Sequence, residues 1–317
     1  MSGLLHQFRN QSIQIVIIMT ENNKGLLTAL GAFTIWGLLP LYWKTLATAI
    51  PIEIVCHRIT WSTATTILLL ILWGKADKLL VVLKNKKVIL RFVLTSLLLS
   101  VNWLIYIWAV NSNYIVESSL GYYMNPLINV LLGVFFLKEQ LRKIQWLSIL
   151  FAFSGVCYLT FAYGRFPWIA IVLALTFGLY GLLRKTASLP SLEGLCLETS
   201  LLFIPALVVL IFLATQGQSD FVQQDSNGRL LLVSTGLVTS LPLLLFGYAA
   251  RKIQLSTLGI VQYLAPSLQL CTGLFVYKES FPREQIIGFS LVWCGLFIYA
   301  TEGIMRHMGR KKRPLET

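Results

Sequence analysis

Charged residues are scarce in this chain, and acidic residues are the scarcer kind. Only 12% of the 317 residues are charged, with 13 acids against 26 Lys and Arg, while 56% are hydrophobic. A soluble domain carries about 25% charged residues. An aqueous fold has no interior large enough for so much apolar surface, so the composition predicts a protein whose solvent is a lipid bilayer.

Motifs for nucleotide, metal and redox chemistry are also missing. There is no GxxxxGK[ST] segment, which argues against a primary pump with a nucleotide fold. The three histidines are scattered without an HExxH segment, and the five cysteines lie in apolar stretches without CxxC or Cys/His spacing. We therefore expect no catalytic residues, no metal site, no disulfide and no cofactor, and the chain is not predicted to be an enzyme.

Apolar runs of membrane-spanning length recur ten times. A helix needs about 20 residues to cross about 30 Å of hydrocarbon at roughly 1.5 Å per residue, and most runs reach that length. The runs cover residues 25–43, 54–73, 92–110, 118–137, 144–163, 166–183, 194–214, 230–250, 256–277 and 285–301. The sequence therefore predicts an all-α integral membrane protein with ten transmembrane helices.

The segment before the first run is different in kind. Residues 13–19 form an apolar run that is too brief to span a membrane, and it lacks a small-residue cleavage pattern. Met19 is followed by polar residues 20–24, as a natural chain start would be. We expect residues 1–23 to form an N-terminal tail, with residues 1–18 as a non-native upstream extension or a disordered segment.

The basic residues predict the orientation in the membrane. With the N-terminus placed in the cytoplasm, 20 of the 26 cationic side chains fall on the cytoplasmic side. Such an excess of Lys and Arg is typical of cytoplasmic loops. The remaining cations are Lys44, Arg165, Arg229, Lys278 and Arg283 on the other face, and Arg58, the only one placed within a span. Topology thus explains the basic charge better than binding to nucleic acid, and both termini are predicted to be cytoplasmic.

A shift of 140 residues aligns the two halves of the chain. The coincidences include Pro126 with Pro266, Gly133 with Gly273, Lys138-Glu139 with Lys278-Glu279, Gln145 with Gln285, Gly155 with Gly295, and Glu53 with Glu193. Each half holds five runs, and since five is odd, the second copy enters the membrane from the opposite side. We expect two inverted five-helix repeats over residues 24–164 and 165–303, followed by a basic cytoplasmic tail over 304–317.

Inverted repeats favour a transport function. Two such copies have two nearly equivalent ways to pack, one open to each side of the membrane, with the solute site at their shared midplane. We therefore predict a secondary transporter that moves a small solute by alternating access. Duplication also builds solute or ion channels and, less favoured here, membrane-embedded enzymes. An enzyme would need a cluster of acid, His or Ser at an interface, and only Glu53 and His57 resemble one.

Polar residues at helical spacing mark a candidate solute path. Tyr122, Asn125 and Asn129 share one face of the fourth run, and Gln262 and Gln269 share one face of the ninth. Polar residues in hydrocarbon generally face the bundle interior or a water-filled path, although amides also serve as interhelical glue. The full candidate set is Asn102, Tyr106, Tyr122, Asn125, Asn129, Gln262, Tyr263 and Gln269, with Pro126 and Pro266 as helix breaks that each free a carbonyl four residues back.

Four ionisable residues are placed within the membrane. They are Glu53, His57, Arg58 and Glu198. Glu53 and His57 are spaced to pair at i and i+4. Arg58 and its repeat equivalent Glu198 lie about 15 Å apart along the membrane normal, so we do not expect them to pair. These residues either bind solute or ions in vestibules or act as snorkelling anchors. The repeated Lys-Glu pairs are predicted to be interfacial anchors.

Several of these segments resemble one family of permeases. They include Trp36-Gly37, His57-Arg58, Asn102-Trp103, Ile107-Trp108-Ala109-Val110-Asn111, Ser119-Leu120-Gly121-Tyr122, Asn125-Pro126, Lys138-Glu139-Gln140-Leu141 and Gln262-Tyr263. Over residues 24–301 the chain resembles RarD-type permeases of the EamA family, in the drug/metabolite transporter superfamily. The resemblance implies a ten-helix permease of the bacterial inner membrane with cytoplasmic ends, whose partners are the lipid bilayer and a small metabolite or drug-like solute.

Overall fold

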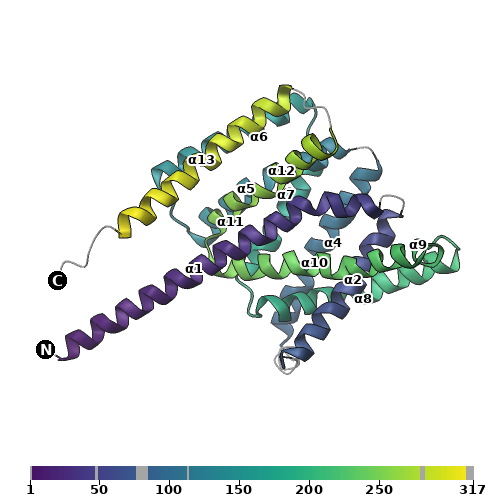
Figure 1. Cartoon of the computed structure of the whole chain (residues 1–317), viewed down its shortest axis with the longest axis horizontal. Helices are drawn as coiled ribbons and strands as arrows, with labels where there is room; N and C mark the ends of the chain where they lie inside the picture. The colour runs from purple at the N-terminus through teal and green to yellow at the C-terminus, as the bar shows by residue number, and fades with distance from the viewer. Residues whose placement is uncertain (1, 47–48, 76–84, 113, 279–282, 312–317) are drawn as a thin grey trace. The chain divides into compact units, whose positions relative to one another are not determined.

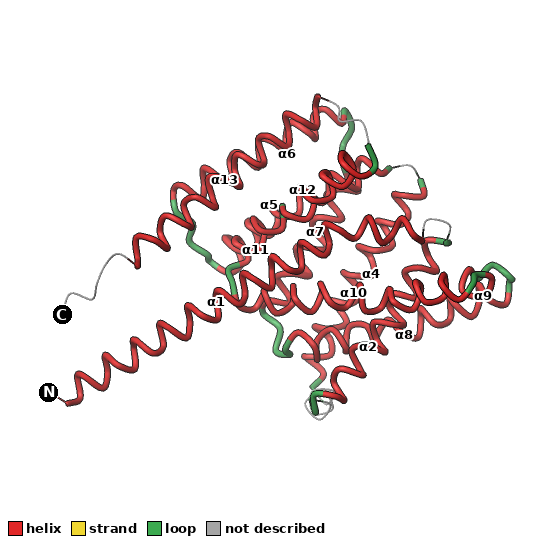
Figure 2. The backbone as a smooth tube through the Cα atoms, viewed as in Figure 1, coloured by secondary structure: helices red, strands yellow, loops and turns green. Residues whose placement is uncertain are grey.

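A computed structural model describes residues 2–46, 49–75, 85–112, 114–278 and 283–311. Every regular element within these residues is helical, as the uniform red of Figure 2 shows. The elements are α1 (Ser2–Trp43), η1 (Lys44–Leu46), α2 (Pro51–Leu72), α4 (Lys86–Asn111), α5 (Ile115–Leu137), α6 (Lys143–Tyr163), α7 (Trp168–Lys185), α8 (Ser191–Thr215), α9 (Asp220–Gln223), α10 (Ser226–Lys252), α11 (Leu255–Gln262), α12 (Leu264–Cys271), η2 (Thr272–Val276) and α13 (Arg283–Lys311).

Ten segments in the described part of the chain are long and apolar enough to cross a membrane, which confirms the predicted fold class. Each coincides with one of the ten apolar runs. The first lies inside α1, which begins at Ser2, but the apolar span itself begins at Glu21. The ninth is made of three consecutive elements, α11, α12 and η2.

The chain divides into two compact units, and each unit contains helices from both halves of the sequence. The first unit comprises Met1–Ser96 and Leu183–Gln254, in which α2 packs on α8 and on α10, and α1 packs on α10. The second comprises Leu97–Leu182 and Leu255–Thr317, in which α5 packs on α11 and α6 on α13. Figure 1 shows α6 and α13 lying side by side.

Three of these pairs join helices that the 140-residue shift makes equivalent: α2 with α8, α5 with α11, and α6 with α13. All three run antiparallel. In the last pair, a Cβ on Gly155 would lie 2.6 Å from the carbonyl oxygen of Gly288, and a Cβ on Gly295 would lie 2.5 Å from that of Ser148. Glycines therefore let these two backbones approach closely, as small residues do at membrane helix interfaces.

Candidate functional site

The ninth span is interrupted in the middle, at Tyr263. α11 ends at Gln262, four residues before Pro266, and α12 begins at Leu264, two residues before it. Pro266 has no N–H to bond the Gln262 carbonyl, so the break follows from the proline. In contrast, α5 continues unbroken past Pro126. Interrupted helices near the bilayer midplane often border solute and ion sites in transporters.

Two of the predicted path residues meet at this break. The Asn129 amide nitrogen donates a hydrogen bond to Oε1 of Gln262 at 2.7 Å, and both side chains are buried. Oδ1 of Asn129 and Oδ1 of Asn125, one turn earlier on α5, have no hydrogen-bond partner among the described residues. Buried polar atoms are normally satisfied, so these two unpaired oxygens are exceptional in the described chain.

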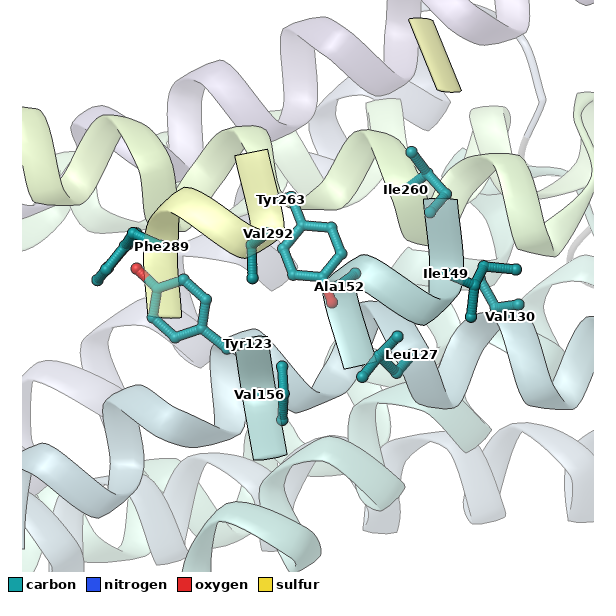
Figure 3. Packing of buried hydrophobic residues seen from close by; sticks show 10 residues of the cluster. All are labelled: Tyr123, Leu127, Val130, Ile149, Ala152, Val156, Ile260, Tyr263, Phe289 and Val292. Atoms are coloured by element: carbon teal, nitrogen blue, oxygen red, sulfur yellow. The ribbon is translucent and has the colours of Figure 1, made fainter. Parts of the chain in front are cut away.

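Tyr263, the residue at the break, is also buried, and it lies among apolar side chains. Its ring packs with Leu127, Ala152 and Val292 in a core cluster that joins α5, α6, α11 and α13 (Figure 3). Its side chain is 0% exposed, and within the described chain its hydroxyl finds no hydrogen-bond partner. In the same cluster the Tyr123 hydroxyl donates to the Pro266 carbonyl at 3.4 Å.

The other predicted path residues lie on α4, α5 and α12. Asn102 donates to the Leu173 carbonyl and to Oγ1 of Thr176, both at 2.9 Å, and so joins α4 to α7. Tyr106 meets Tyr122 edge to face, with ring centroids 5.9 Å apart. Gln269 is half-buried on α12. Asn102 thus acts as interhelical glue in this structure, whereas the two tyrosines bring α4 and α5 together.

Glu139 clamps the beginning of α11 to the end of α5. Its carboxylate accepts hydrogen bonds from the Leu255 N–H (2.7 Å), the Ser256 N–H (2.9 Å) and the Ser256 hydroxyl (2.6 Å). A carboxylate at a helix N-terminus satisfies free N–H groups and interacts favourably with the helix dipole. Gly133 leaves room for it, because a Cβ there would lie 2.6 Å from Oε2 of Glu139.

The turn that joins α5 to Glu139 contains a residue with a left-handed backbone conformation. Lys138 has φ 56°, and the Glu139 N–H bonds back to the Gly133 carbonyl at 3.0 Å. Its repeat equivalent Lys278 has φ 53°, so the two sequence-equivalent turns share an uncommon backbone conformation. Glu279, the other half of the second predicted anchor pair, lies outside the described residues.

The Glu53 carboxylate holds the segment around α9. It accepts from the Ser219 hydroxyl (2.7 Å), the Asp220 N–H (2.7 Å) and the Phe221 N–H (3.1 Å). The predicted pairing with His57 is confirmed, with Nε2 of His57 3.6 Å from Oε1 of Glu53. Three hydrogen bonds to one segment show that Glu53 anchors the chain between α8 and α10.

Arg58 also bonds within its own unit. Its Nε donates to Oγ1 of Thr239 at 3.0 Å, and its guanidinium carbon lies 5.0 Å from the centre of the Trp43 ring. Arg58 therefore links α2 to α10 and to the end of α1. Glu198 has a different partner, as expected from the predicted separation of these two residues.

The partner of Glu198 is Arg184, one of the 20 cationic residues that the charge pattern places on the cytoplasmic side. Arg184 is the next-to-last residue of α7, is only 1% exposed, and lies with Nη1 3.6 Å from Oε1 of Glu198. That Arg58 is the only basic residue within a span stays a prediction. The apolar run ends at Leu183, and nothing in the local sequence distinguishes a buried arginine after it from a solvated one.

Neither unit offers a metal centre in its described residues, where no three His, Cys, Asp or Glu side chains converge. In the second unit, the polar groups near the break in the ninth span are the amides of Asn125, Asn129 and Gln262 and the phenol of Tyr263.

Comparison with known proteins gives consistent matches over nearly the whole chain. The EamA-like transporter family matches residues 23–161 and, a second time, residues 167–301. "Protein RarD" of Streptomyces exfoliatus is 42% identical over 299 residues, covering 93% of this chain and 94% of that protein. "Uncharacterized transporter YojE" of Bacillus subtilis is 43% identical over 283 residues, covering 88% of this chain and 94% of that protein.

One solved crystal structure is also similar. It is 19% identical to this chain, covers 87% of this chain with 97% of its own, and superposes with a TM-score of 0.66. At that identity the likeness concerns the fold alone.

Proposed function

Because the chain belongs to the EamA-like transporter family, we propose that it is a secondary transporter that moves a small metabolite or drug-like solute across the bacterial cytoplasmic membrane by alternating access. Two of its relatives are named as transporters, and the ten apolar spans in the described chain support a multi-pass membrane protein. The mechanism, the solute class and the orientation are the proposed part.

The observation that supports alternating access is that α5 packs closely against only one end of the ninth span, the end formed by α11. Gly133 faces Ser256, Asn129 faces Gly259 and Tyr123 approaches Pro266, so the two spans run antiparallel. Backbone contact is extensive along α11, where Glu139 clamps the helix, but not along α12 or η2. Two sequence-equivalent spans that touch closely at one end support a carrier that closes one side at a time.

The Asn129–Gln262 pair beside the interrupted ninth span is the proposed solute subsite. Two oxygens at this subsite have no hydrogen-bond partner in the described chain: Oδ1 of Asn129 and Oδ1 of Asn125, one turn earlier. As acceptors, they suit a solute with hydroxyl, amide or ammonium donors. One relative, 27% identical, is named "Chloramphenicol-sensitive protein RarD" of Pseudomonas aeruginosa. Chloramphenicol carries hydroxyl and amide donors. It is therefore included, with the amino acids, among the compounds to be tested for binding.

The test is binding followed by uptake. Purified full-length protein is screened by thermal shift against chloramphenicol, the amino acids and a panel of amphiphilic metabolites, and the stabilising compounds are then offered to proteoliposomes as radiolabelled solutes. We expect uptake that saturates with concentration and is absent from protein-free liposomes. Uptake that rises linearly without saturation would favour the channel alternative instead.

The proposed subsite gives a mutational prediction. We expect Asn129→Leu and Asn125→Leu each to abolish uptake while leaving folded protein in the membrane, because the solute would lose one of the two amide oxygens that accept its hydrogen bonds, and an unpaired polar group costs about 1–3 kcal/mol in a dry site. Asn102→Leu is the matched control, since Asn102 bonds only within the α4–α7 contact in the described chain. It should lower stability by about 0.6 kcal/mol and leave uptake near normal. Lost stability with retained solute binding in the first two variants would contradict the subsite.

The proposed orientation gives a second prediction. Reporters fused after Lys87, Arg142, Lys252 or Arg313 should report the cytoplasm, and reporters at Arg165 or Ser219 the opposite face, because the positive charge gathers on the cytoplasmic side. Activity of alkaline phosphatase and fluorescence of green fluorescent protein at each site provide the measurement. A single reporter found on the side opposite to the predicted one would contradict the ten-span topology.

A further inference from the structure

An ion pair is buried inside the first compact unit. Arg184 of α7 and Glu198 of α8 are 1% and 0% exposed, and Nη1 of the arginine lies 3.6 Å from Oε1 of the glutamate. Glu198 is seven residues into α8, or about 10 Å along the helix from its start. Buried ion pairs seldom add stability over apolar packing, and ionisable residues inside membrane spans are mostly functional.

The guanidinium of Arg184 lies in a narrow slot between α8 and α10. Gly194 of α8 and Gly247 of α10 form its walls, since a Cβ on Gly194 would overlap Nη1 and a Cβ on Gly247 would lie 2.7 Å from Nη2. The Phe92 ring lies against it, with its centroid 5.9 Å from the guanidinium carbon. Nη2 donates to the Ser191 carbonyl at 3.0 Å, while Nε and Nη1 form no hydrogen bond within the described chain.

Other charged groups around the pair have their own contacts. Arg251 of α10 donates to the Leu189 carbonyl, and Arg91 of α4 donates to the Thr186 carbonyl. Lys185 of α7 donates to the Ala250 and Ile253 carbonyls. On α8 itself Glu193 is buried, and no described residue bonds its Oε2.

Neutral groups face Glu198 from the two remaining helices. The Ser96 hydroxyl of α4 donates to the Glu198 backbone carbonyl at 3.2 Å. α2 runs antiparallel to α8 with Leu70 beside Leu192, which places Glu53, His57 and Arg58 at the far end of that contact. Arg184 is the cation that forms an ion pair with the Glu198 carboxylate, at 3.6 Å.

We propose that Glu198 is a proton-binding site, with the hydrogen ion as its ligand, and that its occupancy controls the position of Arg184. Arginine keeps its charge at any physiological pH, so the carboxylate is the member of the pair that can gain a proton. A hydronium ion transfers its proton to a carboxylate oxygen, which forms one O–H bond and releases water. The pair then changes from net neutral to a single positive charge on the guanidinium.

That change destabilises the present arrangement. A guanidinium without a counter-charge is costly in a buried slot. Arg184 is one residue from the end of α7, so it can leave the slot toward the membrane surface by a local change. Proton binding at Glu198 thus favours a different packing of α7 against α8 and α10. This step rests on the proposed function, and it identifies the proton as the ion that drives solute movement.

The first test needs no solute. Infrared difference spectra of the full-length protein in liposomes, between pH 4 and pH 9, should show a protonated-carboxyl C=O band that is absent in Glu198→Gln. Arg184→Gln should change the frequency of that band, because the carboxyl group loses the guanidinium that lies 3.6 Å away. Glu193→Gln is the control of matched burial and should retain the band.

A band that persists unchanged in folded Glu198→Gln, or a band whose frequency Arg184→Gln leaves unchanged, would overturn the proposal. If Glu198→Gln does not fold, Glu198→Asp serves instead, and it should keep a carboxyl band with a changed frequency. An unchanged band in Glu198→Asp also counts against the site.

The second test measures coupling with the solute identified by the uptake screen. In proteoliposomes the wild-type protein should accumulate it several-fold more under an imposed pH gradient than without one. Glu198→Gln should lose this dependence on the gradient while still exchanging the solute at equal pH. Gradient-driven accumulation that survives in Glu198→Gln contradicts the coupling. If wild-type protein moves no solute, the proposed transport fails, but the infrared titration still decides the proton site.

Discussion

Replacing Glu139 by alanine should free the beginning of α11 from α5. The variant loses three hydrogen bonds to a carboxylate, two of them from N–H groups at a helix N-terminus. Charge-assisted hydrogen bonds contribute about 1.5–3 kcal/mol each, and water replaces part of that contribution at an interface. With about 3 kcal/mol lost, amide hydrogen exchange at Leu255 and Ser256 should be on the order of 100-fold faster.

Hydrogen exchange measured by mass spectrometry on the peptide over residues 253–262 tests this expectation. Glu302→Ala is the matched control, because the ion pair that Glu302 forms is with Arg142, at 2.5 Å, and it joins the beginning of α6 to α13. It should leave exchange in that peptide unchanged. Equal exchange in wild type and Glu139→Ala would mean that the clamp does not hold α11. Uptake by Glu139→Ala should also fall, since the carrier loses the contact that closes one side.

Replacing Gly236 by alanine should destabilise the first unit, because the added methyl group has no space. A Cβ at Gly236 would overlap the backbone carbonyl carbon of Trp61, where α10 crosses α2. The same contact carries a hydrogen bond from the Ser62 hydroxyl to the Gly236 carbonyl at 3.1 Å. Backbone atoms on both sides cannot rotate away, so the two helices must separate.

We expect Gly236→Ala to lose at least about 2 kcal/mol of stability, in the upper part of the range for overpacked cores. Gly303→Ala is the control, because a Cβ there meets nothing within 4 Å. Melting temperature in detergent and the yield of monodisperse protein measure the difference. A Gly236→Ala protein as stable as the control would show that α2 and α10 do not approach this closely.

Span boundaries were predictable because charge and apolarity are local properties. The fourth run was predicted to end at Leu137, and α5 ends there, where Lys138 takes a left-handed conformation. The pairing of Glu53 with His57 was predictable for the same reason, since i and i+4 are neighbours on any helix.

Long-range partners were not predictable. Glu139 meets Leu255 and Ser256 more than a hundred residues away, and Arg184 meets a slot shaped by two glycines on other helices. A Lys-Glu pair after an apolar run has the same local sequence whether it anchors at a lipid surface or clamps another helix. The proline rule predicted a freed carbonyl in both spans, but only the ninth span breaks, while α5 continues past Pro126.

The central claim is that this chain is a carrier with two alternately open states, and counterflow tests it most directly. Proteoliposomes are loaded with unlabelled solute at high concentration, diluted into a trace of the labelled solute, and followed over time without an ion gradient. The account predicts a transient accumulation of label above its equilibrium level, because each return of the carrier from the inside brings a labelled molecule back in. Label that only approaches equilibrium, without an overshoot, would contradict alternating access and indicate a channel.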